Sequence, residues 1–408
     1  MTPSSSLNRV VEPDLASVMF RGELRLAKCA ASENGSALLD RVDTPSATET
    51  MGSDSDAPNP LEMRAEDAGR APLGVSAIIV NYDGGPLLLE CIASLEGQGL
   101  LETIVVDNES HDGSAAAARS RYPGVAVLSP GRNLGFAEGA NVGAWEARGE
   151  LLLFLNPDIR LGPGVVRALA DELGESSVGV VGPPLRVAGA KSVEHGATVD
   201  VIGSPVPLDR PGRPLYIPGC ALMTRAKLFR ELGGFDGRLF MFVEDVDYCW
   251  RVLVRGFDVK VAEVDPVWHE GGAAAPGGYI RRGRLTSTSF RVALRERNTL
   301  TVLLKCYGTP LVCVVAPVYV LQSLATAGML AAWGRRATAR AVVAGLLWNF
   351  RELRRTLELR RQVQRSRRVG DAAILRRMHR GIWKLSLLRR FGVPSVAEEG
   401  PSVTNLGR

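Results

Sequence analysis

Four apolar runs in the first half of the chain each end in polar residues of the kinds that hold ligands. These residues are the pairs Asn81 and Asp83, Asp107 and Asn108, Arg132 and Asn133, and Asn156 and Asp158. If the runs are parallel strands of one sheet, the pairs share the edge at which open α/β sheets bind ligands. Asn and Asp after a strand also form ordinary turns, which explains any single pair. Four pairs on one edge favour a ligand site.

The residues around these pairs exclude a dinucleotide site and a phosphate loop, and they favour a site for a cation that carries a diphosphate. The first run continues as NYDGGP, which is not the GxGxxG of a dinucleotide fold, and the chain has no GxxxxGK[ST] phosphate loop. In Asn156-Pro157-Asp158 a carboxylate follows a strand on a turn that proline stiffens. This position suits a hard cation with oxygen ligands that carries a diphosphate. Taken alone, the three residues are also typical of a plain turn.

Two further groups of residues allow either chemistry or a structural role. Glu244, Asp245 and Asp247 stand among apolar and aromatic residues, where unpaired acids are costly. One of these acids either caps a helix that starts here or serves as a general base whose pKa is tuned by burial. His269, in the string WHEGG, is equally typical of a metal ligand, a phosphate contact and a core histidine.

Alternating strands and helices are predicted to position these residues. Apolar runs at 75–82, 102–108, 125–130 and 151–158 are separated by helical patterns. Strands that are apolar throughout are typical of a parallel sheet covered on both faces. We therefore expect an α/β fold with a doubly wound, mainly parallel sheet. After an irregular segment at 186–218, a helix is expected to begin at Glu244–Asp245, and a last strand and a Gly-rich loop at 258–272.

Composition divides the 408-residue chain into four regions. With 46% hydrophobic and 23% charged residues, it is neither a collagen nor a disulfide scaffold. Residues 1–72 are rich in Ser, Pro and acidic residues, which predicts a disordered arm. We expect the sheet domain at 73–290, a helical, membrane-associated basic region at 291–390 and a flexible tail at 391–408.

The C-terminal third combines a strong positive charge with a long apolar segment. Residues 281–408 hold 25 Lys and Arg against 6 Asp and Glu, a balance of +19. Residues 310–333 carry no charge and as a helix would be about 36 Å long, enough to cross a bilayer. Anionic lipid is a better partner than nucleic acid, because no nucleic-acid-binding motif occurs. A solvated helical bundle with a charged face is the alternative, and whether 310–333 spans the membrane or lies in it stays open.

Seven strings in fixed order resemble glycosyltransferase family 2, and most of all its bacterial rhamnosyltransferase-like subgroup. The strings are VNYDGG (80–85), VVDNESHDGS (105–114), GRNLGFAEGAN (131–141), LFLNPDIRL (153–161), PGCALMTR (218–225), GGFDGRLFMFVEDVDYCWRV (233–252) and VWHEGG (267–272). From the first string to the last they span about 200 residues. The resemblance implies a GT-A fold with a C-terminal helical, membrane-associated region.

The resemblance also implies roles for particular residues. It places six residues at the nucleotide-sugar donor, which are Asn81, Asp83, Asp107, Asn133, Asn156 and Asp158. It makes Asp158 and His269 the ligands of a divalent metal, Mg²⁺ or Mn²⁺, and Asp245 the catalytic base. Glu244 and Trp268 would border the acceptor cleft. In the DxD pattern of the family the first acid is replaced here by Asn156, which leaves the metal one charged ligand fewer.

The implied activity is an inverting, metal-dependent transfer of a sugar, with rhamnose as a candidate. The donor would be a dTDP- or UDP-sugar, and the acceptor a glycan or lipid-linked sugar of cell-surface polysaccharide synthesis. We expect the enzyme at the cytoplasmic face of the cell membrane, in contact with lipid and not with nucleic acid. Two alternatives remain: a non-catalytic, membrane-anchored protein that binds nucleotide sugars, and another nucleotide-using α/β enzyme such as a nucleotidyltransferase.

Overall fold

The computed structural model describes residues 74–271, 280–281, 284–391 and 395–397. All of these residues belong to one compact unit of the chain. The disordered arm predicted for 1–72 lies outside the described residues, and so does most of the tail predicted for 391–408.

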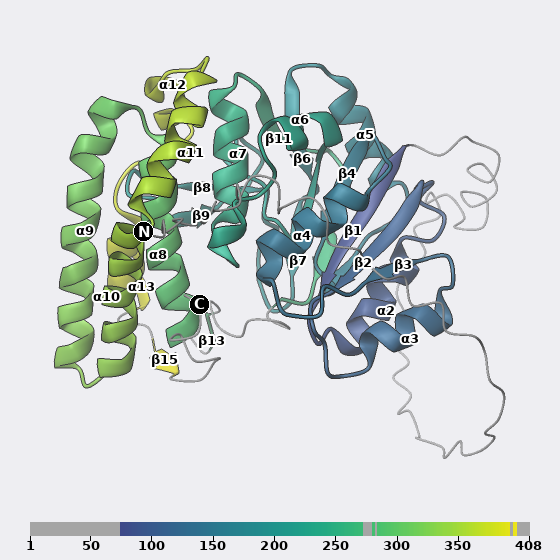
Figure 1. The fold of residues 1–408 in the computed structure, drawn as a ribbon, viewed down its shortest axis with the longest axis horizontal. Coiled ribbons are helices and arrows are strands. Elements are labelled where there is room, and N and C mark those ends of the chain that lie inside the picture. The colour runs from purple at the N-terminus through teal and green to yellow at the C-terminus, as the bar shows by residue number, and fades with distance from the viewer. Residues whose placement is uncertain (1–73, 272–279, 282–283, 392–394, 398–408) are drawn as a thin grey trace, which may run out of the picture. The chain divides into compact units, whose positions relative to one another are not determined.

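A seven-stranded sheet in the order β11-β6-β10-β4-β1-β2-β3 forms the centre of the fold (Figure 1). Its strands are β1 (Val75–Asn81), β2 (Glu102–Asp107), β3 (Ala126–Leu128), β4 (Leu151–Leu155), β6 (Val178–Gly182), β10 (Ala221–Arg225) and β11 (Asp258–Val261). Only β10 is antiparallel to its neighbours, β4 and β6. The prediction of an α/β fold with a mainly parallel sheet is confirmed.

Helices cover both faces of this sheet, which is why its strands are apolar throughout. In β1, Ile78 and Val80 belong to one hydrophobic cluster, whereas Ala77 and Ile79 belong to the other. The helices are α2 (Gly85–Ser94), α3 (Ser114–Arg121), α4 (Gly135–Glu146), α5 (Val165–Gly174), α6 (Ala226–Glu231) and α7 (Glu244–Val254). Residues of α4, α6 and α7 join the first cluster, and residues of α2, α3 and α5 join the second.

Smaller sheets lie outside the central one. Strands β5 (Ile159–Arg160), β12 (Val267–His269) and β7 (Leu185–Val187) form one sheet, in which His269 pairs with Ile159. Strands β8 (Ala197–Val199) and β9 (Pro205–Pro207) form a hairpin, and β13 (Ile280–Arg281), β14 (Arg284–Thr288) and β15 (Ser395–Ala397) form the last sheet. The pairing of β5 with β12 brings His269 beside the turn that contains Asp158.

The C-terminal region is helical, as predicted. Its helices are α8 (Ser289–Cys306), α9 (Thr309–Ala332), α10 (Arg336–Arg351), α11 (Leu353–Arg365), α12 (Asp371–Leu375) and α13 (Trp383–Phe391). Helix α8 contacts α7 of the sheet domain as well as α9, α10 and α11, and α9 and α10 lie farthest from the sheet in Figure 1. Among the described residues, α9 is the one helix long and apolar enough to cross a membrane, and 28% of its most apolar stretch is buried in the fold.

Candidate active site

Asn81 joins the ends of the first two strands of the sheet. Its side chain is fully buried, and Nδ2 donates hydrogen bonds of 2.9 Å to both Ser110 Oγ and Ser114 Oγ. The same nitrogen lies 3.5 Å from Oδ1 of Asp107. Asn81 therefore fixes the loop after β2 against the end of β1, in addition to any contact with a donor.

The other predicted donor residues also stabilise loops at this edge. Asp83 is exposed and has a φ of 49°, and its Oδ1 accepts a 2.6 Å hydrogen bond from the His111 backbone. The backbone N–H of Asn133 donates to Glu109 Oε2 at 3.1 Å, which joins the loops after β3 and β2. These contacts bring Asn81, Asp83, Asp107 and Asn133 together, and their contact with a nucleotide stays a prediction.

Asp158 is buried beside His269 at the junction of the two sheets. Its Oδ2 accepts a 3.1 Å hydrogen bond from the Gly271 backbone. Its Oδ1 is buried without a hydrogen-bond partner among the described residues and lies 3.5 Å from Nε2 of His269. A buried carboxylate oxygen that faces an imidazole nitrogen is a fitting pair of ligands for a divalent cation. No cluster of three or more such ligands occurs in the described part of the chain.

His269 lies in an environment that stabilises positive charge. Burial opposes protonation of the imidazole, whereas Cys220 and the Asp158 carboxylate favour it, and the net effect raises the pKa of His269 to about 11. The cysteine, which sequence reasoning missed, lies in the string PGC, immediately before β10. This corner of the site therefore favours a cation beside Asp158. That cation is either the proton on His269 or a metal ion that replaces it, because only the neutral imidazole binds a metal.

Asp245 stands at the start of α7, where the helix dipole favours a negative charge. Its Oδ2 accepts a 3.0 Å hydrogen bond from the Gly219 backbone, and its Oδ1 accepts one of 2.8 Å from Val246. Burial raises the pKa of Asp245, although these hydrogen bonds and Arg295 oppose the rise. Burial and the neighbouring Asp245 raise the pKa of Glu244 well above its usual range. The pair thus combines a Glu244 whose surroundings disfavour its charged form with an oriented Asp245 carboxylate that suits proton transfer.

The segment Gly219-Cys220 connects the two acids. Gly219 donates to Asp245, and the backbone N–H of Asn156 donates to the Cys220 carbonyl at 3.0 Å. Asn156 begins the turn that carries Asp158, and Cys220 adjoins His269. Asp158 and Asp245, which are 87 positions apart in the sequence, therefore flank one dipeptide at the edge of the sheet.

Trp268 is placed differently from His269. Successive side chains of a strand point to opposite faces, so Trp268 faces away from the side of β12 that carries His269. Its Nε1 donates to Glu270 Oε2 at 2.9 Å, and the Arg160 guanidinium lies 5.6 Å from its ring centre. The structure does not bring Trp268 to the Asp158–His269 pair, and its acceptor role stays a prediction.

The loop before Asp245 has a strained backbone. Phe240, Phe242 and Val243 have φ values of 62°, 69° and 72°, a region that costs about 1–3 kcal/mol for each non-glycine residue. The loop also packs on the start of α4, where a Cβ on Gly135 would lie 2.4 Å from the Phe240 carbonyl oxygen. Glycine is therefore required at 135, and other contacts must hold the loop in this conformation.

Asn298 of α8 supplies those contacts. Its buried Nδ2 lies within hydrogen-bond distance of three loop carbonyls, of Leu239 (2.8 Å), Met241 (2.9 Å) and Phe242 (2.8 Å). Arg297 donates to the Leu239 carbonyl as well, at 3.1 Å. Sequence reasoning missed both residues. The available signal is the string RERN (295–298), four polar residues within an otherwise mainly apolar helix.

We expect Asn298→Ala to lower kcat about tenfold and to leave donor affinity unchanged, because a slight displacement of Asp245, the predicted base, should disturb transfer more than binding. Asn349→Ala is the matched control. Asn349 is also buried, but it donates to the carbonyls of Arg297 and Gly345, away from the loop. Steady-state kinetics and donor titration of both variants check this expectation. An equal loss of kcat in the two variants would show that Asn298 acts on stability alone.

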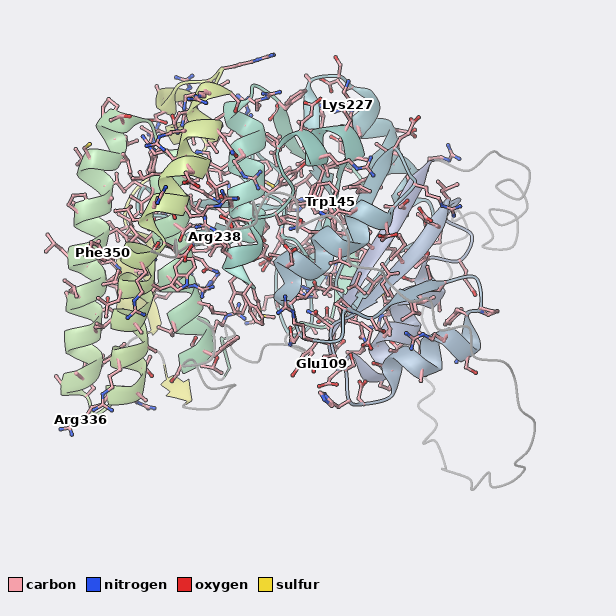
Figure 2. All side chains as sticks on the ribbon, in the orientation of Figure 1. Glu109, Trp145, Lys227, Arg238, Arg336 and Phe350 are labelled. Atoms are coloured by element: carbon pink, nitrogen blue, oxygen red, sulfur yellow. The ribbon has the colours of Figure 1, made fainter. Side chains whose placement is uncertain are left out.

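Buried ion pairs join α8 to the sheet domain below this loop. Nζ of Lys305 lies 2.6 Å from Oδ2 of Asp236 and 2.7 Å from Oδ1 of Asp247. Asp247 also pairs with Arg251 at 2.9 Å, and Asp236 with Arg238 at 2.7 Å. Arg238, labelled in Figure 2, lies where the sheet domain meets α11. Helix α8 is therefore anchored to the elements that precede and follow Asp245.

A mainly parallel sheet with polar loops at one edge, and with two acids beside that edge, defines an α/β enzyme that acts on a nucleotide-linked substrate. The family model of glycosyl transferase family 2 matches residues 76–233. The chain is 31% identical over 230 residues to the N-acetylglucosaminyl-diphospho-decaprenol L-rhamnosyltransferase of Mycobacterium tuberculosis, covering 47% of this chain and 75% of that protein. The chain belongs to glycosyltransferase family 2.

Two further matches are more distant. The pre-mycofactocin glycosyltransferase of Mycobacterium tuberculosis is 25% identical over 236 residues, which cover 51% of this chain and 48% of that protein. A solved structure of the mannosyltransferase PcManGT from Pyrobaculum calidifontis, in complex with GDP-Man and Mn²⁺, is 18% identical with a TM-score of 0.43, covering 73% of this chain and 86% of that one.

The family establishes the general activity and the fold. The chain is a GT-A glycosyltransferase that transfers a sugar from a nucleotide sugar to an acceptor. The two alternatives, a non-catalytic binding protein and a nucleotidyltransferase, are not supported by these relatives. The predicted resemblance to the rhamnosyltransferase-like subgroup is confirmed.

Proposed function

We propose that the enzyme transfers a hexosyl group, with rhamnose as the first candidate, to a lipid-linked or glycan acceptor in cell-surface or cell-wall polysaccharide synthesis. The name of the mycobacterial relative, a rhamnosyltransferase that acts on a lipid-linked sugar, supports this choice. The observation that carries the proposal is the convergence of Asp158 and Asp245 on the segment Gly219-Cys220.

The proposed chemistry is one inverting displacement. Asp245 accepts the proton of the acceptor hydroxyl while that oxygen attacks the anomeric carbon from the face opposite the leaving diphosphate. The hydrogen bonds from Gly219 and Val246 fix the orientation of the carboxylate. The raised pKa of Glu244 disfavours a second negative charge beside the base. The donor is a dTDP- or UDP-sugar, bound along the edge formed by Asn81, Asp83, Asp107, Asn133 and Asn156.

A divalent cation, Mg²⁺ or Mn²⁺, fits this site through Asp158 and His269. The buried Oδ1 of Asp158, which has no hydrogen-bond partner among the described residues, and Nε2 of His269 would hold it. When bound, the cation would supply charge neutralisation at the leaving diphosphate. The protein contributes an oriented carboxylate whose other oxygen is already fixed by Gly271.

We place this enzyme at the cytoplasmic face of the cell membrane. Nucleotide sugars are cytosolic, and a lipid-linked acceptor is held in the bilayer. The basic C-terminal region, with a balance of +19, supports contact with anionic lipid.

The proposed function is tested by incubating the full chain with dTDP-rhamnose, UDP-sugars and GDP-sugars in the presence of a polyprenyl diphosphate-linked N-acetylglucosamine acceptor. We expect transfer from dTDP-rhamnose, and a product whose anomeric configuration, read by NMR, is opposite to that of the donor. Retention of configuration would contradict the mechanism. Transfer from another donor alone would contradict the choice of rhamnose.

We expect Asp158→Ala to weaken donor binding only when the divalent cation is present. Removing the carboxylate removes a cation ligand. The unsubstituted protein should therefore bind the donor more tightly with the cation than with chelator, whereas the variant should bind it equally under both conditions. Isothermal titration calorimetry with the donor, with Mn²⁺ and with chelator, measures both affinities. Identical donor affinities for the two proteins under both conditions would reject the role of Asp158.

A further inference from the structure

Helix α9 carries an apolar face that the described part of the chain leaves exposed. Val314, Val318, Leu321 and Leu324 recur at the spacing of one helical face and are 63%, 50%, 66% and 46% exposed. Helix α10 continues this surface with Val343, Leu347 and Phe350, and Phe350 is 77% exposed. Contiguous exposed apolar surface of this kind marks a contact with a partner or a membrane.

The opposite face of α9 is bound to the protein by polar contacts. Tyr319 and Ser323 each donate a 2.9 Å hydrogen bond to Oε2 of Glu296 on α8. The second oxygen of Glu296 pairs with Lys384 of α13. Burial favours the neutral form of Glu296, but Lys384 outweighs it and lowers the pKa of Glu296, so the carboxylate stays ionised.

These contacts are incompatible with a membrane-spanning α9. To cross the hydrocarbon, α9 would have to leave Glu296 or take α8 with it, and charged residues at the bilayer centre are costly. Helix α8 is itself held to the sheet domain by the buried ion pairs of Lys305. Helix α9 therefore stays packed against α8, and among the described residues its other face is left open.

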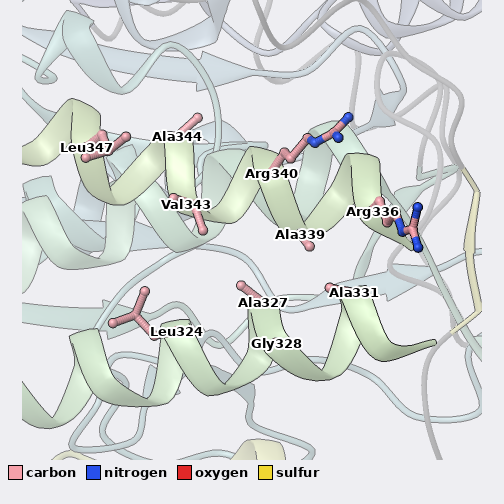
Figure 3. A pocket seen from close by; sticks show the side chains of 10 residues that line it. All are labelled: Leu324, Ala327, Gly328, Ala331, Arg336, Ala339, Arg340, Val343, Ala344 and Leu347. Atoms are coloured by element: carbon pink, nitrogen blue, oxygen red, sulfur yellow. The ribbon is translucent and has the colours of Figure 1, made fainter. Parts of the chain in front are cut away.

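A groove between α9 and α10 has the composition of a lipid site (Figure 3). It has a volume of about 540 Å³ and is lined mostly by apolar side chains, including Leu324, Val343 and Leu347. Arg336 and Arg340 line the same groove, and in the described part of the chain neither makes an ion pair with a carboxylate. From Arg336 to Leu347 the groove follows α10 for about 16 Å.

The charge around this groove is complementary to an anionic surface. Arg336 and Arg340 are four positions apart on one helix, a spacing at which like charges repel each other unless an anion lies between them. Between Thr309 and Arg351 the sequence holds four arginines and no acidic residue. An uncharged apolar partner would leave Arg336 and Arg340 without counter-charge, whereas phosphate groups would supply it.

We propose that the outer face of α9 and α10 docks on an anionic phospholipid bilayer, with both helices lying in the plane of the interface. A lipid acyl chain occupies the groove, and its phosphate lies between Arg336 and Arg340. The exposed residues Leu321 and Phe350 enter the headgroup boundary, as in other interfacial helices. The inference extends the membrane contact of the proposed function, but its test uses neither donor nor acceptor.

Flotation of the full chain with lipid vesicles tests this proposal. We expect binding to vesicles of phosphatidylcholine mixed with phosphatidylglycerol, weaker binding to phosphatidylcholine alone, and weaker binding at high salt. Each arginine contributes about fivefold near an anionic surface, so Arg336→Gln combined with Arg340→Gln should weaken binding about 30-fold. Leu347→Ser with Phe350→Ser should weaken binding to both kinds of vesicle.

Trp145→Ser and Lys227→Gln are the matched controls. Both residues are exposed on the sheet domain, on α4 and α6, and Figure 2 shows them away from Arg336 and Phe350. They should leave vesicle binding unchanged.

Three results would overturn the proposal. The first is binding without a preference for anionic vesicles. The second is resistance of the bound protein to alkaline carbonate extraction, which indicates a spanning helix, and the third is a stable dimer in solution that Leu347→Ser dissociates, which indicates that a second copy covers this face. Because the assay needs no transfer, an inactive enzyme that still binds vesicles would refute only the proposed function.

Discussion

Asp245→Asn is expected to retain the nucleotide-sugar donor but to lose sugar transfer by a factor of about 10²–10⁴, the usual contribution of a positioned base. The amide oxygen can still accept the backbone hydrogen bond from Gly219, and only the one from Val246 within the same helix turn is lost, so the loop geometry should persist. It cannot accept the proton of the acceptor hydroxyl. Single-turnover transfer measured beside donor calorimetry separates the two effects, and unchanged turnover would refute the assignment.

The pH dependence of the unsubstituted enzyme provides a control for this prediction. As the proposed base, Asp245 would act in its deprotonated form, so transfer should fall as the pH drops through its pKa. Because burial raises that pKa above the usual 3.8 of an aspartate, this decline should lie at a higher pH than an exposed aspartate would give. The residual activity of Asp245→Asn should show no such decline. If the residual activity of the variant still declines at the same acidic pH, the decline belongs to another titrating group.

Lys305→Met is expected to destabilise the protein by about 3 kcal/mol. Lys305 is almost fully buried and pairs with both Asp236 and Asp247, so a methionine of similar length would leave two buried acids with one partner each. The midpoint of urea unfolding, followed by circular dichroism, measures this loss. Arg354→Ala is the control, because Arg354 is exposed and its pair with Glu358 is worth at most about 1 kcal/mol.

The acid sensitivity of folding should change in the same variant. Although burial favours protonation, Lys305 and Arg238 hold the pKa of Asp236 well below its usual range. A depressed pKa stabilises the fold at neutral pH, and this contribution is lost as the pH falls through the folded-state pKa. Lys305→Met should therefore lose less stability on acidification than the unsubstituted protein. If Lys305→Met lowers the free energy of unfolding by the same amount at neutral and at acidic pH, Lys305 does not stabilise the ionised form of Asp236.

The positions of the two acids could be predicted from sequence because they follow local signals. Asp158 stands on a proline turn after an apolar strand, and Asp245 stands at the first turn of a helix with an aromatic and apolar face. His269 is ambiguous from sequence, because only the pairing of β12 with β5 brings it beside Asp158, and pairing between distant strands leaves no local pattern.

Other features depend on packing between distant segments. The antiparallel direction of β10 cannot be predicted from alternating apolar runs, since those runs have the same composition in either direction. Asn298 resembles any polar residue of an exposed helix, and only its burial against the Leu239–Phe242 carbonyls reveals its role. Likewise, the apolar composition of 310–333 could not distinguish a spanning helix from one bound on one face by Glu296.

The most direct measurement is an anomalous difference map from crystals of the full chain grown with Mn²⁺ and a nucleoside diphosphate. We predict a Mn²⁺ peak against Oδ1 of Asp158, with the diphosphate along the sheet edge and the Asp245 carboxylate facing the same space. A peak elsewhere, or a diphosphate separated from Asp245 by protein, would contradict a shared catalytic site for the two acids.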